Sequence, residues 1–145
     1  MIDKFAPGIA EALAEVPDAA TILLGGFGAV GQANPLIEGL LDTGVSNLTI
    51  VANNAGYGKV GLARLLREGR VRKLICSYPR IAGSTIFEEL YSAGKLELEL
   101  VPQGTLAERM RAAGAGIPAF FTPTGANTLL SQGKEIPASM SERSC

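Results

Sequence analysis

Short apolar runs alternate with helical stretches along most of this sequence. The predicted strands are residues 21–24, 48–52, 74–77, 96–101 and 119–121. The predicted helices, in which apolar residues recur at helical spacing or follow a capping signal, are residues 3–16, 34–43, 61–68, 85–93 and 105–113. Strand–loop–helix units in regular order predict a parallel sheet covered by helices. The predicted fold class is therefore α/β, an open and mainly parallel sheet with helices on both faces.

The length of 145 residues suits one domain with a substantial hydrophobic core. We predict that this domain spans residues 1–133. Residues 134–145 combine serines with scattered charges and show no periodicity, a pattern typical of a disordered tail.

Charge and apolar patterning argue against several classes of function. Thirteen basic and fourteen acidic residues give a net charge of −1 without any block of Lys and Arg, so we expect no nucleic-acid partner. The apolar run at 19–24 is far too short to span a bilayer, so we expect no membrane association. The first residues do not form a signal sequence, and two cysteines do not make a disulfide framework. These features predict a cytoplasmic location.

The sequence contains no histidine, which narrows the chemistry it can perform. A Ser-His-Asp or Cys-His centre is excluded, and so is a histidine-based zinc site. Cys76 lies in a predicted strand and Cys145 is the last residue, so neither replaces the histidines, and no metal site is predicted. Any chemistry must use carboxylates, amides, hydroxyls or main-chain N–H groups.

A cluster of glycines directly follows the first predicted strand: Gly25, Gly26, Gly28 and Gly31. Consecutive glycines let the backbone approach a ligand and point several N–H groups at one anion. Two alternatives stay open, a simple packing loop and a dinucleotide-binding turn. The spacing fits the G-x-G-x-x-G pattern of the latter, but the helix begins only near Pro35 and no acidic residue follows the next strand.

Amide side chains follow two other predicted strands. Asn53 and Asn54 come directly after residues 48–52, where they could orient a carboxylate or form an Asx turn, and the turn is the more common role. Gln103 and Gly104 lie between a strand and a helix. Since ligands bind where parallel strands end, we expect these residues at the binding edge of the sheet. The spacings Thr85 to Glu88 and Thr105 to Glu108 predict capping boxes.

Three ordered motifs together resemble one known family. They are Gly25-Gly-Phe27 followed by Gly31, the string PQGTLAER at 102–109, and GAGIPA at 114–119 with TPTG at 122–125. Over residues 18–133 the sequence is similar to the A subunits of the family I coenzyme A-transferases, the 3-oxoacid and 3-oxoadipate enzymes. The resemblance implies the Rossmann-type fold of the CoA-transferase and NagB-like group.

The resemblance also implies a covalent mechanism shared by two kinds of subunit. In the B subunit, a glutamate attacks an acyl-CoA such as succinyl-CoA, and a glutamyl-CoA thioester then passes CoA to a 3-oxo acid. No Glu-Asn-Gly context for that nucleophile occurs here, so no catalytic residue is expected in this chain. The expected partners are the CoA-transferase B subunit in a hetero-oligomer, an acyl-CoA and a 3-oxo acid. Coenzyme A enters as a substrate, and no permanent cofactor is expected.

By the same resemblance, two groups of residues line the site. The oxyanion or CoA-binding group is Gly25, Gly26, Phe27, Gly28 and Gly31. The substrate-binding group is Asn53, Asn54, Gln103 and Gly104.

The sequence departs from the family pattern in two places. Gln32 and Ala33 stand where the family commonly has a residue followed by Pro, which changes the expected loop shape. The family's A subunits also continue with further strands, so we expect a sheet incomplete at its C-terminal end. An inactive truncated fragment and a Rossmann-like nucleotide- or phosphate-binding domain are the alternative functions.

Overall fold

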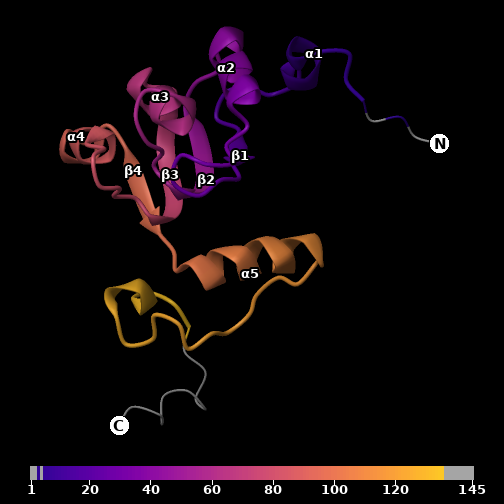
Figure 1. The fold of residues 1–145 in the computed structure, drawn as a ribbon. Coiled ribbons are helices and arrows are strands. Elements are labelled where there is room, and N and C mark those ends of the chain that lie inside the picture. The colour runs from indigo at the N-terminus through magenta and orange to yellow at the C-terminus, as the bar shows by residue number, and fades with distance from the viewer. Residues whose placement is uncertain (1–2, 4, 136–145) are drawn as a thin grey trace. The chain divides into compact units, whose positions relative to one another are not determined.

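The computed structural model describes residue 3 and residues 5–135, and the chain falls into two compact units, Met1–Glu99 and Leu100–Cys145 (Figure 1). The first unit holds the sheet and four of the helices, and the second begins at the end of the last strand. Beyond Glu135, the predicted tail at 134–145 lies outside the described residues.

A four-stranded sheet organises the first unit. Its strands are β1 (Thr21–Leu23), β2 (Leu48–Asn54), β3 (Val71–Tyr78) and β4 (Glu97–Leu100), in the spatial order β1-β2-β3-β4. β1 pairs with β2 and β2 pairs with β3, both in parallel. The predicted parallel α/β sheet is confirmed, and all four strands lie where strands were predicted.

Helices α1 (Ile9–Leu13), α2 (Asn34–Thr43), α3 (Gly61–Arg67) and α4 (Ile86–Ser92) belong to the same unit. Consecutive helices touch one another, so they form a row along the sheet (Figure 1). Helix α2 ends at Gly44, whose φ of 81° favours glycine. Whether helices cover both faces of the sheet stays a prediction, because the remaining helix belongs to the second unit.

The hydrophobic core lies between this row of helices and one face of the sheet. Alternate residues of β2 and β3 point to the same face, and those on the helix side are buried. The core includes Leu48, Ile50, Leu74 and Cys76 from the strands and Ile37, Leu40, Leu62, Leu65, Leu66 and Phe87 from the helices. Ion pairs from Arg72 to Glu97 at 2.9 Å and from Lys73 to Glu99 at 2.8 Å connect β3 to β4.

The second unit consists of α5 (Gln103–Gly114), an irregular segment and a short 3-10 turn at Leu129–Ser131. The predicted strand at 119–121 is wrong, because these residues form no ladder. Pro118 and Pro123 flank the segment, and proline cannot donate to a sheet. Among the helices of the described residues, none is both long and apolar enough to span a membrane.

Both predicted capping boxes are wrong, although the helices themselves form. The Thr85 hydroxyl donates to Glu89 Oε1 at 2.6 Å and makes no cap to the backbone. Thr105 lies inside α5, which begins two residues earlier, and Glu108 pairs with Arg111 at 2.7 Å. Helix α2 begins at Asn34, as predicted, and its N-cap is Ala33, which makes no side-chain cap.

Replacing Leu66 with Ala tests the packing of the helix row on the sheet. Leu66 is 1% exposed in the core, whereas Leu36 in α2 is 42% exposed and serves as a matched control. We expect Leu66→Ala to lower the free energy of unfolding by about 2–5 kcal/mol, and Leu36→Ala by less than about 1 kcal/mol. Urea denaturation followed by circular dichroism measures both, and equal losses would contradict this core.

Candidate functional site

The glycine-rich loop after β1 folds into a small hairpin. The N–H of Phe27 donates to the carbonyl of Val30 at 2.9 Å, and the N–H of Val30 donates to the carbonyl of Phe27 at 3.1 Å. The φ angle of Gly28 is 61°, whereas that of Ala29 is not positive. This combination defines a type II′ turn with glycine at its first central position. Phe27 and Val30 are 77% and 78% exposed, so the tip of the hairpin faces solvent.

The main chain around this hairpin presents N–H groups that the sheet does not use. The N–H of Leu24 still donates to the carbonyl of Val51 at 2.9 Å. Within the described part of the chain, the following residues donate their N–H to no main-chain carbonyl: Gly25, Gly26, Gly28, Ala29 and Gly31. N–H groups gathered on one short loop can bind an anion. Phe27 was predicted in this group, but its own N–H is committed to the hairpin.

The side chain of Gln32 joins this loop to the first turn of α3. Its Nε2 donates to the carbonyl of Gly28 at 3.1 Å, and its Oε1 accepts from the N–H of Leu62 at 3.0 Å. Two glycines leave room for it. A Cβ at Gly26 would lie 2.9 Å from Gln32 Cγ, and a Cβ at Gly61 would collide with Gln32 Oε1. The loop is thus tied to a helix that follows 30 positions later in the sequence.

Asn53 and Asn54 are the last two residues of β2, so they extend the predicted strand rather than begin the loop. The Oδ1 of Asn54 accepts from the N–H of Gly56 at 2.7 Å, which is the Asx turn considered above. Its Nδ2 donates to Asn53 Oδ1 at 3.0 Å. Asn54 is 4% exposed and Asn53 is half-buried. The buried amide therefore terminates the strand and orients its more accessible neighbour.

The loops after β2 and β3 lie side by side at the same edge of the sheet. A Cβ on Gly83 would lie 3.2 Å from the hydroxyl of Tyr57. Gly56, with φ of 78°, packs so closely on α3 that a Cβ would lie 2.6 Å from the nitrogen of Ala63. The structure therefore brings the glycine loop, the asparagine pair and the turn before α4 to one edge.

Basic side chains accompany these loops. Lys59 is exposed in the loop after β2, and Arg67 donates to the carbonyl of Gly58 at 3.3 Å. Arg80 extends from the loop after β3 and pairs with Glu88 at 3.4 Å. Positive charge at this edge of the sheet favours an anionic ligand such as a carboxylate or phosphate.

Gln103 and Gly104 belong to the second unit, where they are the first two residues of α5 and are exposed. The sequence placed them in a loop between strand and helix, so their position is corrected to the helix N-terminus. The glycine loop and Asn53 belong to the first unit.

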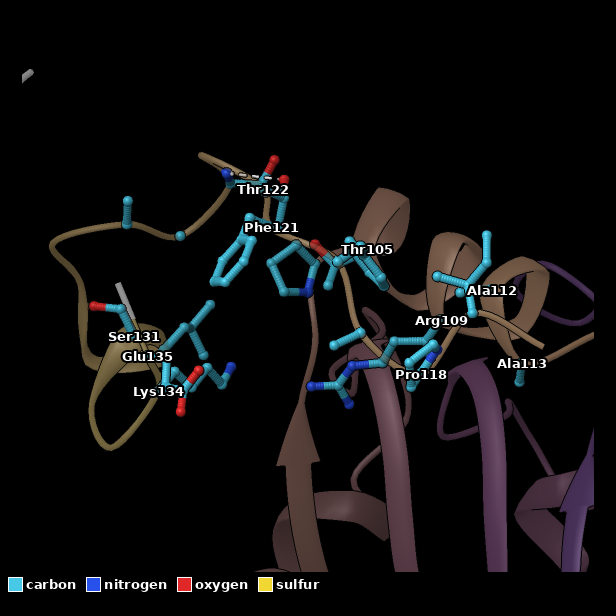
Figure 2. A pocket seen from close by; sticks show the side chains of 18 of the residues that line it. Thr105, Arg109, Ala112, Ala113, Pro118, Phe121, Thr122, Ser131, Lys134 and Glu135 are labelled. Carbon is cyan, nitrogen blue, oxygen red and sulfur yellow. Dashed lines mark hydrogen bonds between the residues drawn. The ribbon is translucent and has the colours of Figure 1, made fainter. Parts of the chain in front are cut away.

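The second unit also contains an open pocket of about 660 Å³ that the sequence did not indicate (Figure 2). Helix α5 contributes Thr105, Arg109 and Ala112 to its wall, and the irregular segment contributes Pro118 and Phe121 (Figure 2). Its lining is mainly apolar. Residues 119–121 line this pocket, which the prediction of a strand there did not suggest. The prolines at 118 and 123 argued against a strand.

Cys76 is fully buried in β3, and burial raises the pKa of its thiol to about 11, although a backbone hydrogen bond at Tyr78 lowers it in part. A neutral thiol without access to solvent is a poor nucleophile. Over residue 3 and residues 5–135, no cluster of three or more Cys, Asp and Glu side chains could hold a metal ion.

The geometry of the first unit is suited to stabilising negative charge on an oxygen. Unpaired N–H groups on a braced loop require little reorganisation when such charge develops. Sequence reasoning did not find Gln32 as part of this arrangement, because its partner Leu62 is distant in sequence. The only sequence feature that pointed to such a role was the position of an amide side chain directly after the glycine cluster.

Comparison with known proteins assigns a family to this arrangement. The model of the family described as Coenzyme A transferase matches residues 7–141. The chain is 59% identical over 134 residues to the A subunit of 3-oxoadipate CoA-transferase from Acinetobacter baylyi, covering 92% of this chain and 59% of that protein. It is 48% identical to the A subunit of succinyl-CoA:3-ketoacid coenzyme A transferase from Xanthomonas campestris, covering 91% of this chain and 54% of that protein.

A solved structure shows the same fold. The crystal structure of glutaconate coenzyme A-transferase from Acidaminococcus fermentans superposes with a TM-score of 0.72 at 25% identity, covering 85% of this chain and 39% of that one. The chain thus spans less than two thirds of the length of the relatives it matches.

Gly26→Ala and Gly28→Ala form a matched pair that tests the loop. At Gly26 the φ angle is 119° and an added Cβ would lie 3.0 Å from the Val30 carbonyl oxygen, whereas at Gly28 φ is 61° and nothing lies within 4 Å. We expect Gly28→Ala to lower the free energy of unfolding by about 1–3 kcal/mol from backbone strain alone. We expect Gly26→Ala to lower it by about 1–2 kcal/mol more, because its Cβ also meets the Val30 carbonyl oxygen. Urea denaturation measures the difference, and equal effects would contradict the hairpin geometry.

The raised pKa of Cys76 predicts a loss of stability at alkaline pH. Above the usual thiol pKa of 9.0 the unfolded chain releases its proton, while the folded chain keeps it up to about pH 11. The contribution to folding is fully present below pH 9 and is lost as pH rises through 11, an effect of about 2–3 kcal/mol.

The measurement is urea denaturation at pH 8 to 11 in a Cys145→Ser background, which leaves Cys76 as the only thiol. Cys76→Ala in the same background is the control, because all other titrating groups are shared. Identical pH profiles for the two proteins would show that the thiol is not shielded in the folded state.

Proposed function

The chain belongs to the coenzyme A transferase family, and on that premise we propose that it serves as the A-type subunit of a heteromeric CoA-transferase. In this role it moves CoA from an acyl-CoA such as succinyl-CoA to a 3-oxo acid, together with a B-type subunit. The observation that carries the proposal is the set of unpaired N–H groups on the braced loop after β1. They suit acyl-transfer chemistry in a chain that has no histidine.

The proposed reaction uses a glutamate nucleophile from the B-type subunit. Its carboxylate attacks the thioester carbonyl, and CoA leaves as a thiolate, which gives an acyl-glutamyl anhydride. The thiolate then attacks the glutamyl carbonyl and releases the first acid, leaving a glutamyl-CoA thioester. The 3-oxo acid reverses both steps and departs as its CoA thioester. Each step passes through an anionic tetrahedral intermediate that needs hydrogen-bond donors rather than a general base.

Within this chain, the glycine loop supplies those donors. We assign the role to Gly25, Gly26, Gly28, Ala29 and Gly31, whose N–H groups are not used by the sheet. Asn53 is proposed to orient the acyl group, and buried Asn54 holds it in place through the bond at 3.0 Å. Gln103 and Gly104, which are exposed at the start of α5 in the second unit, are proposed to bind substrate.

The relatives support 3-oxoadipate as the first acceptor to test, since the A subunit 59% identical to this chain carries that name. The alternative of a dinucleotide-binding turn is disfavoured by geometry. That motif uses its glycines to open a helix and an acidic residue after the next strand. Here the glycines form a hairpin, α2 starts at Asn34, and β2 ends with two asparagines.

Reconstitution with a B-type subunit tests the proposal. We expect the chain alone to transfer no CoA from succinyl-CoA, and the mixture with the B subunit of a 3-oxoadipate CoA-transferase to form 3-oxoadipyl-CoA. Mass spectrometry is expected to find CoA covalently attached to the B subunit, with none on this chain.

Replacing the nucleophilic glutamate of the B subunit with Ala provides the control and is expected to abolish both signals. Acetoacetate in place of 3-oxoadipate tests the acceptor. A stable complex, demonstrated by size-exclusion chromatography, that transfers CoA to neither acid would refute the proposed function.

A further inference from the structure

We infer that Gln32 is a positioning residue that fixes the peptide unit between Gly28 and Ala29, so that the N–H of Ala29 faces the oxyanion of the reaction. This inference rests on the proposed function and names a specific donor within it. It starts from the two hydrogen bonds of the Gln32 side chain, to the Gly28 carbonyl at 3.1 Å and from the Leu62 N–H at 3.0 Å.

The central peptide of a two-residue hairpin turn has two possible orientations. Types I′ and II′ share a positive φ at the first central residue and differ in φ at the second, which corresponds to a flip of the peptide between them. Here φ is 61° at Gly28 and not positive at Ala29, so the peptide adopts the II′ orientation. The hydrogen bond from Gln32 Nε2 to the Gly28 carbonyl holds it there.

The direction of the Ala29 N–H follows from the geometry of the peptide bond. In a planar trans peptide, the C=O and N–H groups point in opposite directions. The Gly28 carbonyl points toward Gln32, so the Ala29 N–H points away from it. Among the described residues, no main-chain carbonyl accepts from this N–H.

The orientation of the Gln32 amide is itself determined by its neighbours. The N–H of Leu62 can only donate, so the side-chain oxygen must face α3 and the side-chain nitrogen must face Gly28. Gly26 and Gly61 keep this path open, because a Cβ on either residue would collide with Gln32. The first turn of α3 therefore sets the direction of a peptide in the loop after β1.

Gln32→Glu separates the two bonds. The carboxylate still accepts from Leu62, but its second oxygen faces the Gly28 carbonyl and repels it, which favours the flipped peptide. Gln32→Met keeps the length of the side chain and loses both bonds. Arg70→Gln is the control, because it also removes a side-chain bond to a glycine carbonyl but does so away from the loop. Arg70 directly precedes β3 and donates to the carbonyl of Gly44, at the end of α2, at 2.6 Å.

The kinetic experiment uses the full chain in complex with its B-type subunit. We expect Gln32→Glu and Gln32→Met to lower kcat by about 10- to 100-fold and to change KM by less than about 3-fold, because a donor is misdirected without loss of binding groups. Arg70→Gln is expected to retain kcat within about 2-fold. Thermal melting of the same samples reports any general loss of stability.

Hydrogen exchange of the full chain gives a readout that does not depend on activity. The N–H groups of Phe27 and Val30 are hydrogen-bonded across the hairpin. Loss of the bond from Gln32 to the Gly28 carbonyl lets this hairpin open more often, so we expect both N–H groups to exchange at least about 10-fold faster in Gln32→Glu but not in Arg70→Gln. Unchanged exchange in Gln32→Glu would overturn the inference.

The outcomes distinguish this inference from the function on which it rests. A wild-type complex without CoA transfer would overturn the proposed function, and with it the role of Ala29. An active wild-type complex whose kcat is unaffected by Gln32→Glu would overturn the role of Gln32 alone. If kcat falls by the same factor in Gln32→Glu and in the control Arg70→Gln, Gln32 has only a structural role, and the inference is overturned.

Discussion

Parallel strands that end at one edge leave their last N–H groups without ladder partners, and this constraint governs the structure of the candidate site. The ladder of β1 stops at the N–H of Leu24, and the following glycines turn away from β2. Positive φ angles at Gly26, Gly28 and Gly31 make this turn possible without strain. The unpaired N–H groups of the loop are thus a consequence of how a parallel sheet terminates.

Beyond the ends of β1 and β2, two amide side chains form hydrogen bonds with main-chain groups that no longer pair in the sheet. Asn54 accepts from the N–H of Gly56 beyond the end of β2, and Gln32 holds the Gly28 carbonyl beyond the end of β1. An amide suits both positions because it combines a donor with an acceptor and carries no charge that must be desolvated. Gln32 also accepts from Leu62, so the two loops are connected through the first turn of α3.

The sequence predicts the frame better than the site, for physical reasons. Apolar residues located β1 to β4, because packing against helices selects them along most of β2 and at alternate positions of β4. The capping boxes failed because a cap depends on one side-chain rotamer, as the bond from Thr85 to Glu89 illustrates. The contact from Gln32 to Leu62 could not be predicted, since it requires knowing which loops meet at the edge of the sheet.

If the chain acts as proposed, acyl specificity resides in the loops rather than in the sheet. The glutaconate enzyme shares the frame at 25% identity, and its name indicates an acid other than the 3-oxoadipate named for the relative from Acinetobacter baylyi. Strand residues such as Ile50 and Leu74 are fully buried and inaccessible to a ligand, so their packing is indifferent to the substrate. The loop after β1 combines a rigid hairpin with the exposed side chains of Phe27 and Val30, which can vary without disturbing the core. On the proposed function, selection for a new acid can therefore act on these exposed side chains, while the peptides held by Gln32 keep their role in the reaction.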